Sequence, residues 1–389
     1  MRIAEIIPYK LHPYSGVMVA AVRLATEFAA RGHHVELWKL HEWIPGETEQ
    51  FSAELAGAGV ETVQVSSGSS PWRLDSGAQA TIAARQVDVA HLHSVFSPLN
   101  NLLSRHLRVP FVISPHGGYA SPVLRRHRFR KLAFKYLLEL PMLRRAAMVF
   151  ALSPAESRQL RQFGYGGPVA VIPNGISGPE LTAGAGEFRA ELGLEPGASL
   201  AVFVGRLDLY YKRLEDVVRG VAATPNWNLA LVGPDWQGSR LRLQRLIAEL
   251  GCRDRVWLLE PRRGNSLHAV LAAATVFVLL SRSEGMPMAL LEALYQGVPA
   301  VVSREVEQSI PVGTEGAGWV TDPAGLSELL IRLGGTGPDV WTRVRGAAAR
   351  YGAAFSWPDI AGRYERSLTQ ALEGELRKPA GAPGATRRA

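Results

Sequence analysis

The sequence predicts an α/β fold built from two doubly wound, Rossmann-like domains that face each other across a cleft. Short apolar runs without alternation, typical of buried parallel strands, repeatedly alternate with amphipathic helical patterns. A turn-rich segment, residues 173–179, interrupts this alternation once, as an interdomain connector does. A chain of 389 residues is long enough for two such domains, each with its own core.

The first half begins with an apolar strand, followed by a helix over residues 17–31. This helix carries Val22, Ala25 and Phe28 on one face and ends at Gly32. Further apolar and β-branched runs follow at spacings that leave room for helices between them. Strands are expected at residues 3–7, 34–39, 87–91, 111–114, 148–152 and 169–172.

The second half repeats the pattern after the connector. Strands are expected at residues 200–204, 229–232, 256–259, 276–280 and 300–302, with helices beginning near Leu214, Gly238, Ser266 and Pro287. A last helix over residues 358–372 has an apolar face and is expected to pack against the body.

These elements place the domain boundaries. An N-terminal domain is expected over residues 1–173 and a C-terminal domain over residues 174–354. A helical segment at residues 355–375 follows, and residues 376–389 lack any apolar pattern, which predicts a disordered tail.

Composition restricts the class of protein. The net charge of +8 and the pI near 9.8 favour anionic partners in general: nucleotides, phospholipid or nucleic acid. Cys252 is the single cysteine, so no intrachain disulfide forms and a reducing cytoplasm is the expected compartment. Glu5 interrupts the first apolar run, which therefore predicts a strand rather than a signal peptide, and no apolar stretch is long enough to span a bilayer.

Much of the excess positive charge lies between Arg125 and Lys135. On a helix, basic residues there form one stripe beside apolar ones: Arg128, Lys131 and Lys135 beside Phe129, Leu132 and Tyr136. The pattern is typical of a helix lying on an acidic membrane surface. It is equally typical of a domain helix with a solvated basic face, and the sequence leaves both open.

Two carboxylates stand eight positions apart at the end of an apolar strand. Residues 274–280 read as a buried strand, and Pro287 suits the first turn of the next helix. Glu284 is thus expected in the turn at the carboxyl edge of the sheet, and Glu292 about two turns into the helix. Ligands of open α/β sheets bind at this edge, and the helix N-terminus between the carboxylates offers N–H groups to a phosphate.

Two cations are expected at the same sheet edge. Arg206 and Lys212 lie six positions apart in the loop that Gly205 opens after the strand at residues 200–204. Paired cations there suit a diphosphate, which they bind and then stabilise as a leaving group. The alternative is two solvent-exposed basic residues in an arginine-rich chain.

Two glycine-containing turns belong to the first domain. Gly16 lies between the first strand and the first helix, where its N–H and the helix dipole suit a phosphate. His116, between Pro115 and a pair of glycines, follows a strand and is placed to contact a sugar hydroxyl or a developing charge. A structural histidine and an ordinary turn glycine are the alternatives. His91 and His93 end another strand, and alternation does not say which of them faces the cleft.

Several signatures are absent from the sequence. There is no G-x-G-x-x-G fingerprint, Walker A sequence, Asp-x-Asp pair, H-E-x-x-H motif, Cys/His cluster or G-x-S-x-G elbow. Nicotinamide and flavin enzymes, P-loop NTPases, metal-templated sugar transferases and serine hydrolases therefore lack their usual parts. We expect neither a metal nor a tightly bound cofactor.

The order and spacing of these motifs resemble the GT-B-fold glycosyltransferases, specifically the retaining enzymes of family 4 (glycosyl transferases group 1). The resemblance covers most of the chain and is strongest over residues 281–299. It also includes Gly16, the turn at His116, residues 171–175 and the loop from Gly205 to Lys212. Ser15 departs from the family pattern, where a glycine pair is usual, and Arg213 replaces the glycine that commonly follows the lysine.

The resemblance implies a nucleotide-sugar donor of the UDP or GDP type, held mainly by the C-terminal domain. Arg206 and Lys212 would grip the diphosphate, beside the turn at Gly205. Glu284 would hold the transferred sugar, with help from the backbone of the residues that follow it: Gly285, Met286, Pro287 and Met288. Glu292 would accept hydrogen bonds from the ribose hydroxyls.

From the N-terminal domain, His116 would contact the donor sugar and Gly16 would approach the diphosphate. The terminal helix at residues 355–375 would cross back to this domain. His116, Arg206, Lys212 and Glu284 are the residues expected to act in catalysis, which in this family retains the anomeric configuration without a metal.

The expected activity is transfer of a sugar to a hydroxyl acceptor, which is a sugar, a lipid-linked group or a small molecule, in polysaccharide or glycoconjugate synthesis. Such an enzyme would be cytoplasmic, and peripheral at the inner membrane face if the basic helix binds lipid. A nucleotide-sugar epimerase of the same fold is one alternative, and a non-catalytic protein that binds anionic membranes is another. Nucleic acid is not an expected partner.

Overall fold

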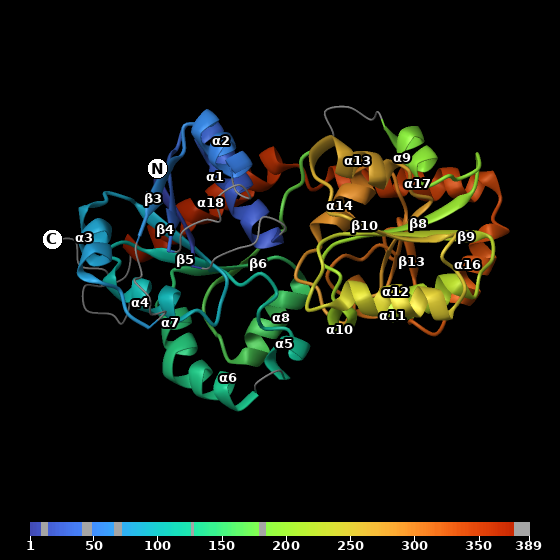
Figure 1. Ribbon diagram of the computed structural model, residues 1–389. Helices are drawn as coiled ribbons and strands as arrows, with labels where there is room; N and C mark the ends of the chain where they lie inside the picture. The colour runs from blue at the N-terminus through green and yellow to red at the C-terminus, as the bar shows by residue number, and fades with distance from the viewer. Residues whose placement is uncertain (9–14, 41–48, 66–71, 126–127, 179–183, 377–389) are drawn as a thin grey trace. The chain divides into compact units, whose positions relative to one another are not determined.

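A computed structural model describes residues 1–8, 15–40, 49–65, 72–125, 128–178 and 184–376. It divides into two compact units, Met1–Gly175 with Trp357–Ala389, and Ile176–Ser356 (Figure 1). Each unit contains one sheet of parallel strands with helices packed against it. The predicted fold class, two Rossmann-like α/β domains, is confirmed.

The first unit holds a seven-stranded sheet in the order β3-β2-β1-β4-β5-β6-β7. Its strands are β1 (Arg2–Ile7), β2 (His34–Lys39), β3 (Glu61–Gln64), β4 (Val89–His93), β5 (Phe111–Ser114), β6 (Met148–Ala151) and β7 (Val169–Val171). Its helices are α1 (Gly16–Ala30), α2 (Glu49–Gly57), α3 (Ser76–Ala84), α4 (Pro98–His106), α5 (Ser121–Arg125), α6 (Arg128–Phe134), the π-helix η1 (Lys135–Glu139), α7 (Leu140–Arg145), α8 (Pro154–Phe163) and α18 (Trp357–Leu376).

The second unit holds a six-stranded sheet in the order β10-β9-β8-β11-β12-β13. Its strands are β8 (Ser199–Val204), β9 (Trp227–Val232), β10 (Val256–Leu259), β11 (Val276–Leu279), β12 (Ala300–Val302) and β13 (Gly318–Val320). Its helices are α9 (Ala185–Glu191), α10 (Leu209–Lys212), α11 (Leu214–Ala222), α12 (Ser239–Glu249), α13 (Gly264–Ala272), α14 (Met288–Tyr295), α15 (Arg304–Glu307), α16 (Leu326–Gly334) and α17 (Pro338–Ala353).

The sequence predicted two of the four edge strands, β7 and β10, and missed the other two, β3 and β13. β3 buries only Val63 among its four residues, and β13 has a partly exposed surface, so neither produces an apolar run. The strand expected at residues 87–91 is in fact β4, Val89–His93, so His93 is a strand residue and not a loop residue. Pro287 caps α14 and lies before its first turn, which places Glu292 little more than one turn into the helix.

The terminal helix α18 belongs to the first unit. Ile360, Tyr364 and Leu368 are buried, as expected of an apolar face that packs on the body. Glu365 of α18 accepts a hydrogen bond of 2.8 Å from Nε of Arg31, at the end of α1. The predicted tail lies outside the described residues, apart from Leu376, which ends the helix.

The π-helix η1 ends at a buried carboxyl group. Glu139 is fully buried and accepts a 2.6 Å hydrogen bond from the hydroxyl of Tyr119 and another from the backbone N–H of Phe96. Burial raises the pKa of Glu139 to about 7, because these hydrogen bonds only partly offset the loss of solvation.

Glu139 is expected to make stability fall as pH rises. Its pKa rises from 4.5 to about 7 on folding, so between these values the folded protein holds a proton that the unfolded chain has lost. The free energy of unfolding should drop by up to about 3 kcal/mol across this window. Glu139→Gln cannot ionise and should lose that drop, as measured by urea unfolding at pH 5 and pH 8. Glu249→Gln, on the exposed face of α12, is the control; equal pH dependence in all three proteins would contradict the prediction.

Candidate active site

The candidate residues gather where each sheet changes its winding direction. In the second unit the chain runs outward from β8 through β9 to β10, then returns to place β11 on the other side of β8. In the first unit β1 and β4 are neighbours for the same reason. Loops that follow such neighbouring strands diverge, and ligands of open α/β sheets bind in the space this creates.

Backbone and side-chain contacts tie the loop after β8 to the loop after β11. The backbone N–H of Arg282 donates to the carbonyl oxygen of Tyr211 at 2.8 Å, and Nε of Arg282 donates to that of Tyr210 at 3.1 Å. The guanidinium of Arg282 also lies 5.0 Å from the centre of the Tyr210 ring. These contacts hold the short helix α10 against the loop that carries Glu284.

Lys212 and Glu284 meet at this junction. Nζ of Lys212 lies 2.5 Å from Oε1 of Glu284, and the two side chains are only 16% and 11% exposed. A pair this shielded from water is screened less than a surface ion pair, and each charge holds the other in place. The backbone carbonyl of Glu284 is held in turn by the hydroxyl of Ser309, at 3.2 Å. The structure thus brings together the predicted cation of one loop and the predicted carboxylate of the other.

Arg206 lies on the opposite side of β8. Its guanidinium stacks 4.3 Å from the ring centre of Trp236, in the loop after β9. The two loops run side by side: Leu207 donates its N–H to the carbonyl oxygen of Pro234 at 3.0 Å. Arg206 itself is exposed, so its N–H groups face solvent while the ring restricts its position. Trp236 was not among the predicted residues, because no motif marks it.

Two glycines allow this close approach. Gly205 has φ +151° and Gly233 has φ +155°, which side chains rarely adopt. A Cβ on Gly233 would lie 1.9 Å from the carbonyl oxygen of Gly205, so the loop backbones are in direct contact.

Helix α14 starts directly after the Glu284 loop. Pro287 is its N-cap, and Met288 is the first helical residue. The N–H groups of a first helical turn have no partner within the helix, so this end suits an anion. Glu292 is half-buried on the same helix. Gly285 and Met286 complete the loop between the carboxylate and the helix.

Arg213 is in a left-handed conformation, φ +52°, which explains why a glycine is usual after the lysine. Its guanidinium bonds Oε1 of Glu305 at 2.6 Å and the carbonyl oxygen of Leu280 at 3.3 Å. Burial tends to raise the pKa of Glu305, but the hydrogen bond from Arg213 outweighs it and lowers that pKa. Arg213 therefore joins the loops after β11 and β12 to the loop after β8.

In the first unit, Gly16 and His116 occupy different kinds of backbone. Gly16 is the exposed first residue of α1 and has no positive φ, so the helix start does not require a glycine for its dihedral angles. His116, after β5, has φ +53°, and Gly117 has φ +80°. Glu156 holds this turn: Oε1 accepts from the N–H of Gly117 at 2.5 Å and Oε2 from that of Leu152 at 2.7 Å.

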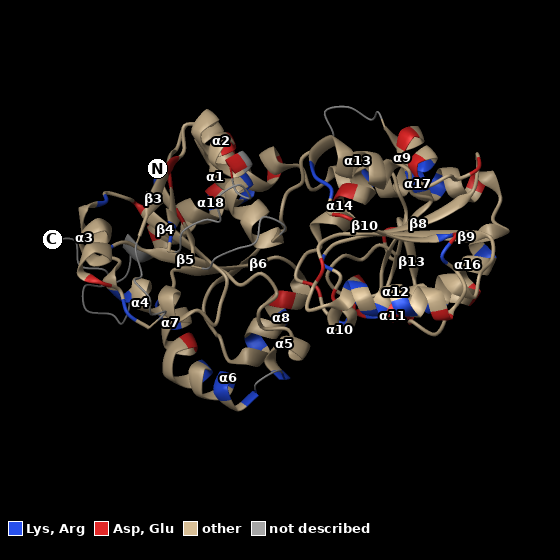
Figure 2. Cartoon of the chain, viewed as in Figure 1, with Lys and Arg blue, Asp and Glu red and all other residues tan. Residues whose placement is uncertain are grey.

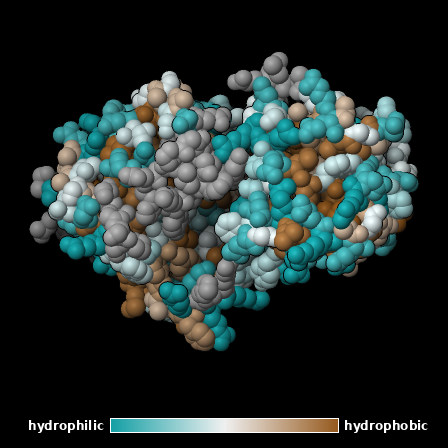
Figure 3. All heavy atoms as spheres, in the orientation of Figure 1, coloured by the Kyte–Doolittle hydropathy of each residue, from teal (hydrophilic) through white to brown (hydrophobic). Residues whose placement is uncertain are grey.

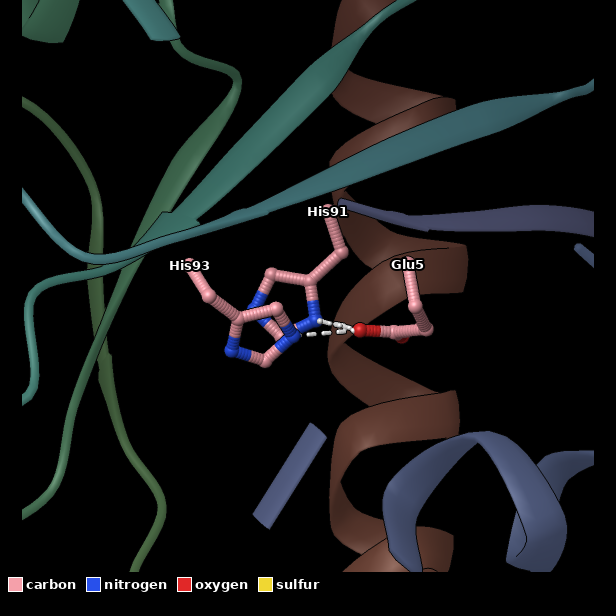
Figure 4. Close-up of side chains that lie close together, drawn as sticks. All are labelled: Glu5, His91 and His93. Atoms are coloured by element: carbon pink, nitrogen blue, oxygen red, sulfur yellow. Dashed lines mark hydrogen bonds and ion pairs between the residues drawn. The ribbon is translucent and has the colours of Figure 1, made fainter. Parts of the chain in front are cut away.

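His116 is connected to a buried polar cluster. Its Nε2 lies 2.8 Å from Nδ1 of His93, and Nε2 of His93 lies 2.6 Å from Oε2 of Glu5. The same oxygen lies 3.0 Å from Nδ1 of His91, whose Nε2 lies 2.7 Å from the hydroxyl of Ser114. Figure 4 shows the two imidazoles of β4 pointing at the carboxylate of β1, beside a helix.

The sequence did not show which of His91 and His93 faces the cleft, and the structure buries both in this cluster. His91 and His93 are both buried and both contact Glu5, because residues two apart on a strand share a face and Glu5 pairs in register with His91. From the sequence, Glu5 was interpreted only as an interruption of an apolar run. A single charged residue within an apolar run, Ile3 to Ile7, is the signal that could have marked Glu5 as part of a buried polar cluster.

Comparison with known proteins now identifies the family. Residues 14–177 match the model of Glycosyltransferase Family 4, and residues 185–332 match that of glycosyl transferases group 1. The chain is a GT-B-fold glycosyltransferase of family 4.

Curated relatives of this glycosyltransferase include two bacterial enzymes. GDP-mannose:cellobiosyl-diphosphopolyprenol alpha-mannosyltransferase of Xanthomonas campestris is 28% identical over 292 residues, which are 72% of this chain and 74% of the relative. D-inositol 3-phosphate glycosyltransferase of Nocardia farcinica is 26% identical over 388 residues, 92% of this chain and 85% of the relative.

Solved structures share the fold. HepE of Anabaena in complex with UDP superposes with a TM-score of 0.78 and 18% identity, over 95% of this chain and 100% of that one. Sucrose-phosphate synthase of Thermosynechococcus elongatus superposes with a TM-score of 0.75 and 22% identity, over 96% of this chain and 99% of that one.

Gly233→Ala is expected to weaken binding of the nucleotide sugar, because the new Cβ would displace the Gly205 carbonyl and with it Arg206. We expect a loss of roughly tenfold or more in affinity, measured by titration calorimetry with UDP- and GDP-sugars. Gly251→Ala is the matched control: φ there is also positive, at +64°, but no described atom lies within 4 Å of its Cβ position. Equal affinities for the two variants would show that contact between the loops does not position the site.

Proposed function

We propose that this glycosyltransferase transfers a sugar, with retention of anomeric configuration and without a metal, from a nucleotide diphosphate to a hydroxyl group in glycoconjugate or polysaccharide synthesis. The observation that carries the proposal is the Lys212–Glu284 pair at the carboxyl ends of β8 and β11, with Arg206 on the other side of β8. Cations and a carboxylate in this arrangement suit a diphosphate joined to a polyhydroxyl group.

Each of the three residues has a distinct role in the proposal. Oε1 of Glu284 meets Lys212, so Oε2 is the oxygen that accepts a hydrogen bond from a hydroxyl of the transferred sugar. Lys212 and Arg206 bind the diphosphate and stabilise the charge that develops on it as the bond to the sugar breaks. The first amides of α14, after Gly285, Met286 and Pro287, add a fixed positive field.

The remaining predicted residues complete the donor site. Glu292, on α14, accepts hydrogen bonds from the ribose hydroxyls. His116 contacts the transferred sugar, and the N–H of Gly16 at the start of α1 approaches the diphosphate. The Gly205 turn lets the backbone of the phosphate-binding loop come close to its ligand.

The reaction has a simple atom balance. The acceptor oxygen attacks the anomeric carbon on the face from which the nucleotide departs, and the bond between that carbon and the diphosphate oxygen breaks. The acceptor proton passes to an oxygen of the departing diphosphate. No Asp-x-Asp pair is present to hold a divalent ion on the donor, so Arg206, Lys212 and the helix dipole supply the positive field.

The relatives support a class of donor and acceptor. The Xanthomonas enzyme is named for GDP-mannose and a polyprenol-linked acceptor, and the Anabaena protein was solved with UDP-glucose. We propose a UDP- or GDP-sugar as donor. The acceptor carries its hydroxyl on a sugar or cyclitol, either free or linked to a lipid.

A lipid-linked acceptor agrees with the surface around α6. Arg128 and Arg130 are exposed on α6, which Figure 2 shows as a concentration of basic residues, and Arg125 is exposed at the end of α5. The predicted stripe also included Lys131 and Lys135, but Nζ of Lys131 donates to the carbonyl oxygen of Val123, and Nζ of Lys135 lies 4.6 Å from the ring centre of Phe163. Large apolar side chains are exposed beside them: Phe129 is 72%, Tyr136 61% and Leu137 71% exposed. Figure 3 shows hydrophobic residues at this end of the molecule. We propose that this face contacts acidic lipid. No helix among the described residues has both the length and the apolar character to cross a membrane.

Arg206→Ala, Lys212→Ala and Glu284→Ala are each expected to lower kcat/KM by about 10²- to 10³-fold, as loss of a transition-state contact does. Arg242→Ala and Glu215→Ala remove an exposed ion pair between α12 and α11 and should change it less than about threefold. NMR of reactions with and without acceptor measures the rate, the anomeric configuration of the product and any conversion of donor alone. Full activity of all three variants contradicts the site, inversion contradicts retention, and sugar interconversion without acceptor indicates an epimerase.

The α6 face is expected to bind vesicles that contain phosphatidylglycerol. Neutralising the exposed residues Arg125, Arg128 and Arg130 together should weaken binding by at least about tenfold, and salt should weaken binding of the wild type, because each basic residue near an anionic surface contributes about 1 kcal/mol. Neutralising Arg332, Arg343 and Arg350 of α16 and α17 is the charge-matched control. Sedimentation with neutral and acidic vesicles separates the cases, and equal binding by both triple variants would contradict the proposal.

A further inference from the structure

The buried cluster at the β1–β4 junction fixes the direction of its hydrogen bonds. Glu5 is fully buried and receives both His91 and His93 on its carboxylate. Burial alone would raise the pKa of Glu5, but its contacts with the two histidines outweigh this effect and lower the pKa to about 2. The group is therefore ionised, and a carboxylate can only accept hydrogen bonds. Nε2 of His93, at 2.6 Å, must be the donor.

The other ring nitrogen of His93, Nδ1, is a hydrogen-bond acceptor. Burial, together with the nearby His91, lowers the pKa of His93, so the imidazole is neutral and carries one hydrogen. Since that hydrogen is on Nε2, Nδ1 has a lone pair. Nδ1 lies 2.8 Å from Nε2 of His116, and two nitrogens at this distance need a hydrogen between them. His116 must supply it.

In His116, the hydrogen lies on Nε2 and leaves Nδ1 as the acceptor. Burial lowers its pKa well below the usual value, so it too carries a single hydrogen, which lies on Nε2. Its Nδ1 then has a lone pair. Among the residues that the structure describes, none forms a hydrogen bond to this Nδ1.

We propose that Glu5 and His93 are positioning residues that hold His116 in the tautomer with hydrogen on Nε2, so that Nδ1 accepts a hydrogen bond from a hydroxyl of the transferred sugar. The inference rests on the proposed function, in which His116 contacts that sugar. In this contact the sugar hydroxyl is the donor and His116 is the acceptor. The chain of hydrogen bonds Glu5–His93–His116, called the relay below, thus makes the buried carboxylate of Glu5 part of sugar recognition. The left-handed turn at His116, held by Glu156, fixes the position of the ring, while the relay fixes which nitrogen is protonated.

A metal ion bound by Glu5, His91 and His93 would change the hydrogen-bond directions, because a histidine nitrogen that binds a metal carries no hydrogen. Ligand atoms of Glu5, His91 and His93 all lie within 4.8 Å of one another. However, ligands about 2.0–2.1 Å from a tetrahedral zinc lie about 3.3 Å apart. The separations from Oε2 of Glu5 are 2.6 Å to His93 and 3.0 Å to His91, the lengths of direct hydrogen bonds.

The tautomer of His116 can be observed directly in the full-length protein without substrate. Long-range proton–nitrogen correlation spectra of protein labelled with ¹⁵N-histidine distinguish protonated from bare ring nitrogens, and the spectrum of His116→Gln assigns the signals of His116. We expect Nε2 protonated and Nδ1 bare. A hydrogen on Nδ1, or stoichiometric zinc in the purified protein by elemental analysis, would overturn the inference.

A pair of identical substitutions on β4 tests the relay. His93→Phe removes the acceptor of His116, so both tautomers of His116 should appear, and kcat should fall roughly tenfold with little change in the KM for the donor. His91→Phe removes the other imidazole on the same carboxylate and should leave the tautomer of His116 unchanged. Identical His116 spectra in both variants would overturn the relay.

The outcomes separate this inference from the proposed function. A bare Nε2 in an active transferase overturns the relay alone. The expected tautomer in a protein that binds no nucleotide sugar overturns the proposed function and leaves the hydrogen-bond direction supported.

Discussion

The topological switch point of each sheet is the constraint on which the site depends. A parallel sheet that winds outward in both directions from its first strand must leave two adjacent strands whose following loops diverge. In the second unit these strands are β8 and β11, and their loops carry Lys212 and Glu284. In the first unit they are β1 and β4, which carry Glu5 and the histidines. Residues separated by 72 to 88 positions in sequence become neighbours there.

Pairs of opposite charges hold the loops at the switch points in place. Three shielded carboxylates near the switch points are each held by a specific donor, since an unpaired charge shielded from water is costly. Lys212 holds Glu284, Arg213 holds Glu305, and two imidazoles hold Glu5. Such pairs preorganise the site, because a ligand that displaces or joins them finds its partners already oriented. The departure of Arg213 from the family glycine follows this logic: the backbone strain of a left-handed arginine is offset by contacts that join three loops.

Two carboxylates, Glu156 and Glu5, hold the surroundings of His116 in different ways. Glu156 binds backbone N–H groups and so fixes the path of the chain at His116, whereas Glu5 acts through side chains and fixes a proton. A catalytic or binding histidine needs both, since its two nitrogens have opposite hydrogen-bonding character when the ring is neutral. Helix α18 also packs against the cluster, because the ring of its buried residue Tyr364 lies 5.8 Å from that of His91, centre to centre.

The sequence by itself determined the fold class, all the central strands, two of the four edge strands and the loops that carry Arg206, Lys212, Glu284 and His116. These depend on local signals: apolar runs for buried strands, and glycine or proline at turns. The edge strands β3 and β13 were missed because neither contains three apolar residues in a row, whereas the equally half-exposed β7 and β10 do. Only the tertiary structure decided which side chains meet. The Lys212–Glu284 pair, the stacking of Trp236 on Arg206 and the Glu5–His93–His116 relay all depend on strand order, which joins segments far apart in the chain and leaves no local pattern in the sequence.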